Sequence, residues 1–338
     1  MDITGEIDLS SMRSMINAFP DLIKMVELNH DVMKQMKEFS REQFRGICIL
    51  GMGGSGIAGN LCKEMYSDEA YAPIICVSDY ILPKYVTKQW IVIGVSYSGN
   101  TEETISAFEQ AVNRGCPTIS ITTGGRLEVL SEGRPICYLP IGFQPRAALP
   151  LLISVQIQIL ETILGLIPTD MKVFSKKINS IANTWKNTSI SPKIIANEIV
   201  GRIPLFIGWQ HLSPVAYRAK CQINENAKTV SFFSVIPENN HNEIEGTGMY
   251  GTFQIVPIFL RSKYETTQIS KRFDATERVI LDEGVRSINL RIETDTKLEE
   301  LVAFTLYVDM ISIELADIRK VDSVSVERIA SLKRILSE

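Results

Sequence analysis

The chain has 338 residues, of which 45% are hydrophobic, and it carries a formal net charge of −4 at pH 7. This length and apolar content allow one large or two medium hydrophobic cores, and they exclude a disordered chain. Because no block of Lys or Arg appears, we expect no nucleic acid and no membrane as partner. A small molecule is the expected partner.

The six cysteines lie far apart and form no Cys-x-x-Cys pair. Several lie within apolar runs such as "IICV" and "CYLP", where cysteine behaves as a small buried hydrophobe. A disulfide framework or a zinc knuckle is therefore disfavoured, and we expect a cytoplasmic protein. The acidic N-terminus does not resemble a signal peptide. The apolar stretch 147–168 is interrupted by Gln156, Gln158 and Glu161, which predicts a buried helix.

The first half of the chain alternates between helix-like and strand-like segments. Apolar residues at helical spacing predict an opening helix over 12–36, with Ser10 or Ser11 at its cap. Short runs rich in Val and Ile follow, separated by segments that read as helices, and they cover 46–51, 72–79, 90–96, 117–123 and 135–140. Strands buried on both faces and joined by helices are typical of a doubly wound parallel sheet. A long helix around 148–165 would close this unit.

The second half repeats the plan after the polar connector "KNTSISP". Its predicted strands and helices cover 202–209, 213–228, 253–260, 269–284, 286–292 and 297–319. We therefore expect an α/β protein with two related doubly wound parallel-sheet subdomains flanked by helices. The predicted boundaries are 1–188 and 189–338.

The stretch "ICILGMGGSG", residues 47–56, joins a strand-like run to a glycine loop. Gly51, Gly53 and Gly56 fit the Gly-x-Gly-x-x-Gly fingerprint of dinucleotide-binding turns. Asp79, at the end of the second predicted strand, could hold a ribose hydroxyl. An NAD-dependent oxidoreductase is therefore one hypothesis, although it leaves the next motif unexplained.

That motif is "SYSGNTEET", residues 96–104, at the end of the third predicted strand. Ser96, Ser98 and Thr101 surround a Gly-Asn pair just before a predicted helix. Loops at the carboxyl ends of parallel strands face the ligand crevice of an open α/β sheet. Hydroxyl groups and free backbone N–H groups at a helix N-terminus are typical of a phosphate-binding site.

The two motifs together resemble the sugar-isomerase (SIS) domain, in which both loops bind a sugar phosphate. Further stretches resemble the bifunctional phosphoglucose/phosphomannose isomerases over nearly the whole chain. These are "QPRAALP" (144–150), "NENAK" (224–228), "PENNHNEIEG" (237–246) and "VERIASLKRIL" (326–336). The resemblance implies interconversion of glucose 6-phosphate, and of mannose 6-phosphate, with fructose 6-phosphate.

Such an aldose–ketose isomerisation moves a proton between neighbouring carbons, so it needs a base and an electrophile that stabilises the enediolate oxygen. The resemblance assigns the base to Glu225 and the electrophile to Arg146. It assigns ring opening to His241, reaching the site from the other subunit of a homodimer. Lys333 falls where the family has a lysine that reaches the substrate, and Gly54, Ser55, Ser96, Ser98 and Thr101 fall on the substrate-binding loops.

Each of these side chains also has a structural alternative. Glu225 could be a solvated surface residue, and Arg146 could form an interface salt bridge. The other two histidines, His30 and His211, match no functional position and are expected to be structural. No motif of zinc ligands appears, so we expect neither a metal nor a cofactor.

One segment departs from the family pattern. The family commonly carries prolines and a threonine before the last helix, whereas this chain reads "VDSVSVERIA", with Val324 flanked by serines. The threonine is tied to accepting mannose as well as glucose configuration, so the phosphomannose activity is the less secure expectation. A non-catalytic SIS module that senses sugar phosphates remains a further alternative.

Overall fold

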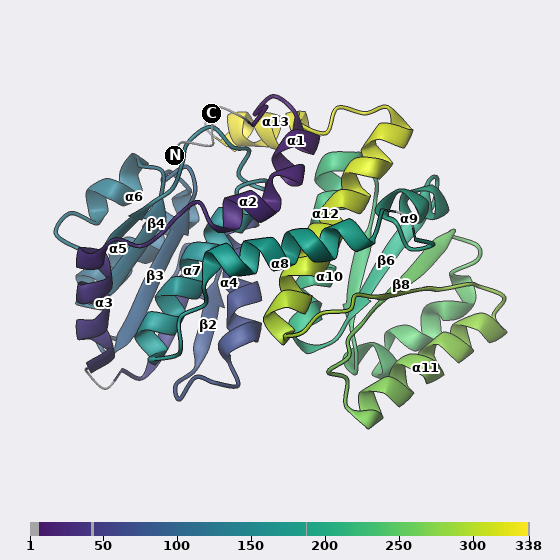
Figure 1. Cartoon of the computed structure of the whole chain (residues 1–338), viewed down its shortest axis with the longest axis horizontal. Coiled ribbons are helices and arrows are strands. Elements are labelled where there is room, and N and C mark those ends of the chain that lie inside the picture. Colours follow the sequence, from purple (N-terminus) through teal and green to yellow (C-terminus); the bar gives the residue numbers. More distant parts are fainter. Residues whose placement is uncertain (1–6, 42–43, 187, 337–338) are drawn as a thin grey trace. The chain divides into compact units, whose positions relative to one another are not determined.

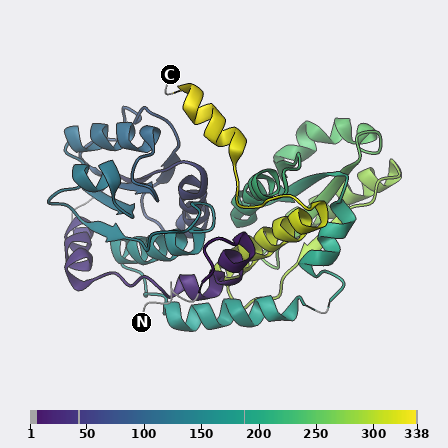
Figure 2. The ribbon, with the colours of Figure 1, turned by 90° about the horizontal axis from the view of Figure 1, so that it is seen from above.

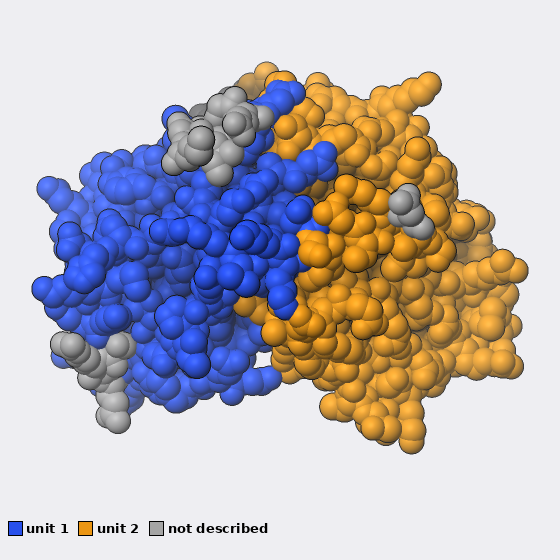
Figure 3. Space-filling view, viewed as in Figure 1, with its two compact units in different colours: residues 1–9, 17–179 blue, residues 10–16, 180–338 orange. Residues whose placement is uncertain are grey.

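The computed structural model describes residues 7–41, 44–186 and 188–336. The chain divides into two compact units, coloured separately in Figure 3. Unit 1 comprises residues 1–9 and 17–179, and unit 2 comprises residues 10–16 and 180–338. Each unit is built around its own parallel sheet.

The N-terminal segment shows that the prediction of one helix over 12–36 is wrong. Three short helices replace it: α1 (Met12–Asn17), α2 (Phe19–Ile23) and α3 (His30–Arg41). Pro20 lies in the first turn of α2, where it cannot supply the N–H that a continuous helix needs. The Asn29 side chain accepts a hydrogen bond from the first turn of α3 at 2.8 Å. Ser11 accepts one from the Ser14 N–H at 3.3 Å at the start of α1, as a cap residue should.

Unit 1 contains a five-stranded parallel sheet in the order β2-β1-β3-β4-β5 (Figure 1). Its strands are β1 (Gly46–Leu50), β2 (Ile74–Val77), β3 (Trp90–Ser96), β4 (Thr118–Thr122) and β5 (Ile136–Tyr138). Every residue of β1, β3 and β4 is buried, which explains why these runs are continuously apolar or small rather than alternating. The predicted doubly wound sheet is confirmed.

Helices cover both faces of this sheet. They are α4 (Gly53–Tyr66), α5 (Glu102–Asn113), α6 (Gly125–Leu130) and α7 (Leu149–Leu164). On one face Trp90 and Val92 pack with Phe108 of α5 and Leu127 of α6. On the other, α7 packs against α2, α3 and α4. Most of α7 is buried, so the prediction of a buried helix for this apolar stretch is confirmed.

Unit 2 contains a four-stranded parallel sheet in the order β7-β6-β8-β9. Its strands are β6 (Ile203–Gly208), β7 (Phe232–Val235), β8 (Ile255–Arg261) and β9 (Ile288–Arg291). In both units the first strand lies between the second and the third. This shared order supports the expectation that the two units are related.

The helices of unit 2 are α8 (Met171–Thr184, shared with unit 1), α9 (Pro192–Ile199), α10 (Ser213–Ala227), α11 (Thr267–Asp282), α12 (Lys297–Arg319) and α13 (Glu327–Leu336). Helix α10 packs on β6 and β7 and, on its other side, against α12. Phe273 and Ile280 of α11 pack with Leu205 and Phe259 of the sheet. Short 3₁₀ segments complete the unit: η2 (Gln210–Leu212), η3 (Glu238–His241) and η4 (Glu243–Met249).

Among the described residues, no helix combines the length and the apolar character that crossing a bilayer requires.

Candidate active site

The glycine loop forms the first turn of α4 at the carboxyl end of β1. The Ser78 hydroxyl donates to the Gly51 carbonyl at 2.7 Å and holds the loop against the end of β2. Met52, at the helix cap, makes no side-chain cap hydrogen bond in this described segment. The backbone N–H groups of Gly53, Gly54 and Ser55 therefore remain available to an anion, which the helix dipole also favours.

Glycine is required in this turn because another chain segment lies directly against it. A Cβ added at Gly54 would lie 3.0 Å from the Pro145 carbonyl oxygen and 3.4 Å from the Arg146 Cα. Gly53 has a φ of +51°, which also favours glycine. The loop thus places Arg146, which is only 5% exposed, beside the N-terminus of α4.

The hydroxyl-rich loop is held in place by the neighbouring turn at 122–127. Gly99 has a φ of +69°, and its carbonyl accepts the Leu127 N–H at 2.9 Å. The Asn100 side-chain oxygen accepts the Arg126 N–H at 3.0 Å. These bonds fix the loop before any ligand is present, and preorganised donors cost less to align with a bound phosphate.

The three predicted hydroxyl residues of this loop do not have equivalent surroundings. Ser96 is fully buried, and its Oγ lies 2.9 Å from the Thr101 Oγ1. Ser98 is exposed, and its Oγ accepts the Asn100 N–H at 3.3 Å. Thr101 caps α5 without a side-chain cap bond in this described part, so the helix N-terminus is open. Ser98 and the α5 N-terminus are therefore the groups best placed to meet a ligand.

Strand order brings the two loops to one edge of the sheet. Strands β1 and β3 are parallel neighbours, with Leu50 paired to Gly94. The loops follow these strands where the strand order reverses, which is where open α/β sheets bind ligands. The Tyr97 hydroxyl donates to the Pro140 carbonyl at 2.8 Å and so ties the second loop to the segment that leads to Arg146. Burial raises the pKa of the Tyr97 hydroxyl.

Glu225 lies near the C-terminus of α10, at the end of the unit 2 sheet where its parallel strands begin. It is half-buried, one helical turn after Cys221, so the alternative of a fully solvated surface carboxylate does not describe it. Burial raises the pKa of the Cys221 thiol, which also interacts with Tyr217. Ser231, just beyond the helix, donates to the Pro204 carbonyl at the start of β6. Glu225 is thereby placed at the amino edge of the strands.

His241 lies on η3, beyond the carboxyl end of β7, and is exposed. Helix α10, whose 15 residues span roughly 22 Å, runs from the carboxyl edge to the amino edge of this sheet. One unit 2 therefore does not bring its own His241 to its Glu225.

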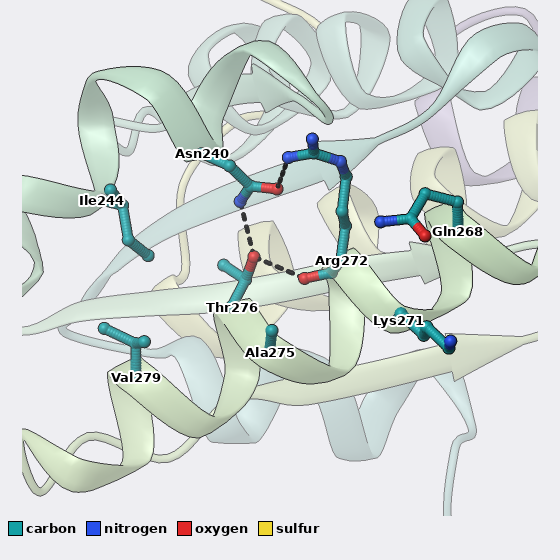
Figure 4. Close-up of a pocket in the computed structure, with 8 residues that line it drawn as sticks. All are labelled: Asn240, Ile244, Gln268, Lys271, Arg272, Ala275, Thr276 and Val279. Carbon is teal, nitrogen blue, oxygen red and sulfur yellow. Dashed lines mark hydrogen bonds between the residues drawn. The ribbon is translucent and has the colours of Figure 1, made fainter.

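A cavity of about 430 Å³ lies between η3, η4 and α11, and Asn240, the residue before His241, lines it (Figure 4). The Asn240 amide donates to the Thr276 hydroxyl at 2.6 Å, and its oxygen accepts from Arg272 at 3.3 Å. These bonds, drawn in Figure 4, hold the Asn240 side chain against α11.

Lys333 is exposed on α13, a helix with no buried residue. Figure 2 shows α13 separated from α12 by an extended connection. That connection is attached to α10: the Lys228 ammonium donates to the Ser325 carbonyl at 2.7 Å. No pattern in the sequence indicates a role for Lys228.

The remaining titratable residues considered from sequence have structural surroundings. His211 is fully buried, and its Nε2 lies 2.7 Å from Glu300 Oε2, as expected for a structural histidine. His30 is exposed. The Asp79 carboxylate accepts the Tyr80 N–H at 2.6 Å. Within the described ranges, no three His, Cys, Asp or Glu side chains gather as metal ligands.

This doubly wound α/β fold, with two loops at one strand edge, is the fold of SIS-type proteins. The structure of tagatose-6-phosphate ketose/aldose isomerase from Escherichia coli superposes with a TM-score of 0.70 at 11% identity, covering 93% of this chain and 94% of that chain. At this identity the match supports the fold alone.

Sequence comparison is more specific. Residues 190–336 match the family model of the bacterial phospho-glucose isomerase C-terminal SIS domain. A bifunctional phosphoglucose/phosphomannose isomerase from Aquifex aeolicus is 32% identical over 87% of this chain and 91% of its own length. A D-glucosamine-6-phosphate 4-epimerase from Sulfolobus acidocaldarius is 35% identical over 64% of this chain and 68% of its own length. The chain belongs to the family of bifunctional phosphoglucose/phosphomannose isomerases.

Proposed function

We propose that the protein interconverts glucose 6-phosphate, and mannose 6-phosphate, with fructose 6-phosphate. The observation that carries the proposal is the pair of uncapped helix N-termini, α4 and α5, at one edge of a parallel sheet, beside exposed Ser98 and buried Arg146. Backbone donors and hydroxyls suit a phosphate, and a guanidinium suits a developing oxyanion.

In this proposal the phosphate binds Gly54, Ser55, Ser98 and the N-terminus of α5. The buried Ser96 hydroxyl holds the Thr101 hydroxyl by a hydrogen bond. Glu225 removes the proton from the carbon next to the carbonyl and returns it to the neighbouring carbon. Arg146 stabilises the enediolate oxygen. Lys333 contacts the substrate, and no metal ion or organic cofactor takes part.

His241 assists ring opening in the proposed mechanism, and it does so across a homodimer interface. The support for this is topological. Glu225 lies where the strands of the unit 2 sheet begin and His241 lies where they end, so a second copy must supply the histidine. We further propose a cytoplasmic location, since all six cysteines are free and reducing compartments keep thiols free.

The test is a coupled assay with chelator present. It follows fructose 6-phosphate to glucose 6-phosphate and, separately, to mannose 6-phosphate, with glucosamine 6-phosphate as a third substrate. We expect turnover of the first pair, and Glu225→Gln should lower kcat by ~10² to 10⁴-fold because it loses the general base. Glu198→Gln, on the exposed face of α9, is the matched control and should keep wild-type rates.

The other outcomes discriminate between alternatives. Glucose product alone would show that Val324 and its neighbours restrict the configuration at C2. Binding of fructose 6-phosphate without turnover would contradict the isomerase and favour a sugar-phosphate sensor. Turnover of glucosamine 6-phosphate alone would favour an epimerase.

A further inference from the structure

Lys228 ends α10 in an unusual backbone conformation. Its φ is 52° and its ψ is 37°, the left-handed region that glycine or asparagine usually occupies after a helix. A lysine has no conformational reason to be there. The contacts of its side chain give a reason for a lysine at this position.

The Lys228 ammonium joins two backbone carbonyls that are about one hundred residues apart in the chain. It donates to the carbonyl of Glu225 at 2.5 Å and to the carbonyl of Ser325 at 2.7 Å. The first acceptor belongs to the proposed base. The second lies in the connection between α12 and α13, two residues before α13 begins. We call this contact the Lys228 bridge.

The backbone around Lys228 is held separately by Arg319, the last residue of α12. Its guanidinium donates to the carbonyls of Ala227 and Lys228 at 2.5 and 2.8 Å. The connection has its own support, because Asp322 accepts the Val324 N–H at 2.8 Å. Loss of the Lys228 side chain should therefore remove the bridge without unfolding either segment.

The bridge matters most for α13, which has no buried residue to hold it in place. A charge-assisted bond to the connection is then a substantial part of what fixes the start of α13 relative to Glu225. We infer that Lys228 is a positioning residue that sets Glu225 and α13, with its Lys333, in one geometry. This inference rests on the proposed function, in which both side chains act on one substrate.

The chain contains a matched control for this inference. Lys320 caps α12 with nearly the same left-handed geometry, φ 53° and ψ 44°, and its side chain has no hydrogen-bond or ion-pair partner in the described part of the chain. Lys228→Gly and Lys320→Gly both place glycine where glycine is favoured. Only Lys228→Gly removes a bridge.

Two readouts test the inference: amide hydrogen exchange over residues 327–336, and kcat and KM for fructose 6-phosphate. We expect Lys228→Gly to speed exchange of α13 and to lower kcat, each by about tenfold or more, the size expected for losing a hydrogen bond to a charged group. Lys320→Gly should stay within about twofold of wild type in both, within the range of ordinary surface changes. Lys228→Arg, which keeps a cationic donor, should restore part of the loss.

Equal exchange in the two glycine variants would overturn the bridge. Faster exchange of α13 with unchanged kcat, in an active enzyme, would overturn the positioning role. If the wild type lacks isomerase activity, the proposed function fails. The exchange comparison then still decides for or against the bridge by itself.

Discussion

Gly54 shows how one missing Cβ can shape a site. The Pro145 carbonyl oxygen and the Arg146 backbone occupy the space that a side chain would need. The glycines of this loop are therefore explained without a bound nucleotide. Gly54 lets the α4 N-terminus approach Arg146, and Gly53 adopts a positive φ. Resemblance to the dinucleotide fingerprint follows from the same need for close backbone approach.

Gly54→Ala should therefore displace Arg146 and damage catalysis more than stability. We expect overpacking to cost about 1–3 kcal/mol of unfolding free energy. We expect kcat to fall by at least about tenfold, because a small misplacement of a catalytic group is costly. Steady-state kinetics and urea unfolding measure the two effects.

Gly251→Ala is the control, since its added Cβ would meet only a Val285 methyl at an ordinary 3.8 Å. A Gly54→Ala enzyme with unchanged kcat would show that the contact with the Arg146 segment has no catalytic consequence.

Helices α10 and α12 are joined by a buried ion pair. Arg218 donates two hydrogen bonds to Asp309, at 2.8 and 2.6 Å, and both side chains are about 1% exposed. Burial raises the pKa of Asp309, although Arg218 acts to lower it. Removing the arginine would leave a buried carboxylate without its counter-charge.

Arg218→Met should destabilise the protein by about 3–5 kcal/mol in denaturant unfolding. Without its partner, Asp309 binds a proton more readily in the folded than in the unfolded chain. Protonation of Asp309 therefore stabilises the folded Arg218→Met variant as the pH falls. Its loss of unfolding free energy relative to the wild type should become smaller from about pH 8 to about pH 5. The double variant Arg218→Met/Asp309→Leu should recover most of the loss; an unrecovered double variant would show that shape, rather than charge, dominates.

Elements with a strong local signal were predictable from sequence. The strands have continuous apolar runs. Helix α12 has the predicted bounds, 297–319, and a Thr296–Glu299 capping box marks its start. The prediction of one opening helix is wrong because the apolar residues keep helical spacing on both sides of Pro20 and Asn29, and that spacing does not show where one helix ends and the next begins. The hydroxyl loop was predictable because one short segment contains it.

Contacts between distant segments could not be predicted in this way. Nothing local to Gly54 indicates that residues 145–146 lie against it. The Lys228 bridge depends on where α10 and α12 end relative to each other, and no periodicity encodes that. Local sequence patterns therefore identify candidate residues, whereas the contacts that hold those residues in place are seen only in the three-dimensional structure.

The whole enzyme requires two chains in our proposal. If the histidine acts across an interface, two inactive variants can complement each other. Glu225→Gln and His241→Asn should each be nearly inactive alone. A heterodimer of the two contains one site with neither residue and one site with both.

Mixing the two variants under conditions that allow subunit exchange should restore about one quarter of wild-type activity, since half of randomly formed dimers are mixed and each has one intact site. Coupled assays before and after exchange, with each variant mixed with itself as control, give the result. Absence of any recovery, while native mass spectrometry of variants that carry tags of different mass shows mixed dimers, would place both residues in one chain's site.

The most direct test of the central claim follows the proton itself. Fructose 6-phosphate is converted in D₂O, and NMR records deuterium at C2 of the glucose 6-phosphate formed. If a carboxylate that exchanges its proton with solvent carries out the transfer, deuterium appears at C2, in full or in part. In Glu225→Gln, both the turnover and the deuterium incorporation should be lost. Conversion at wild-type rate with no deuterium at C2, or undiminished incorporation in Glu225→Gln, would contradict Glu225 as the base of this isomerase.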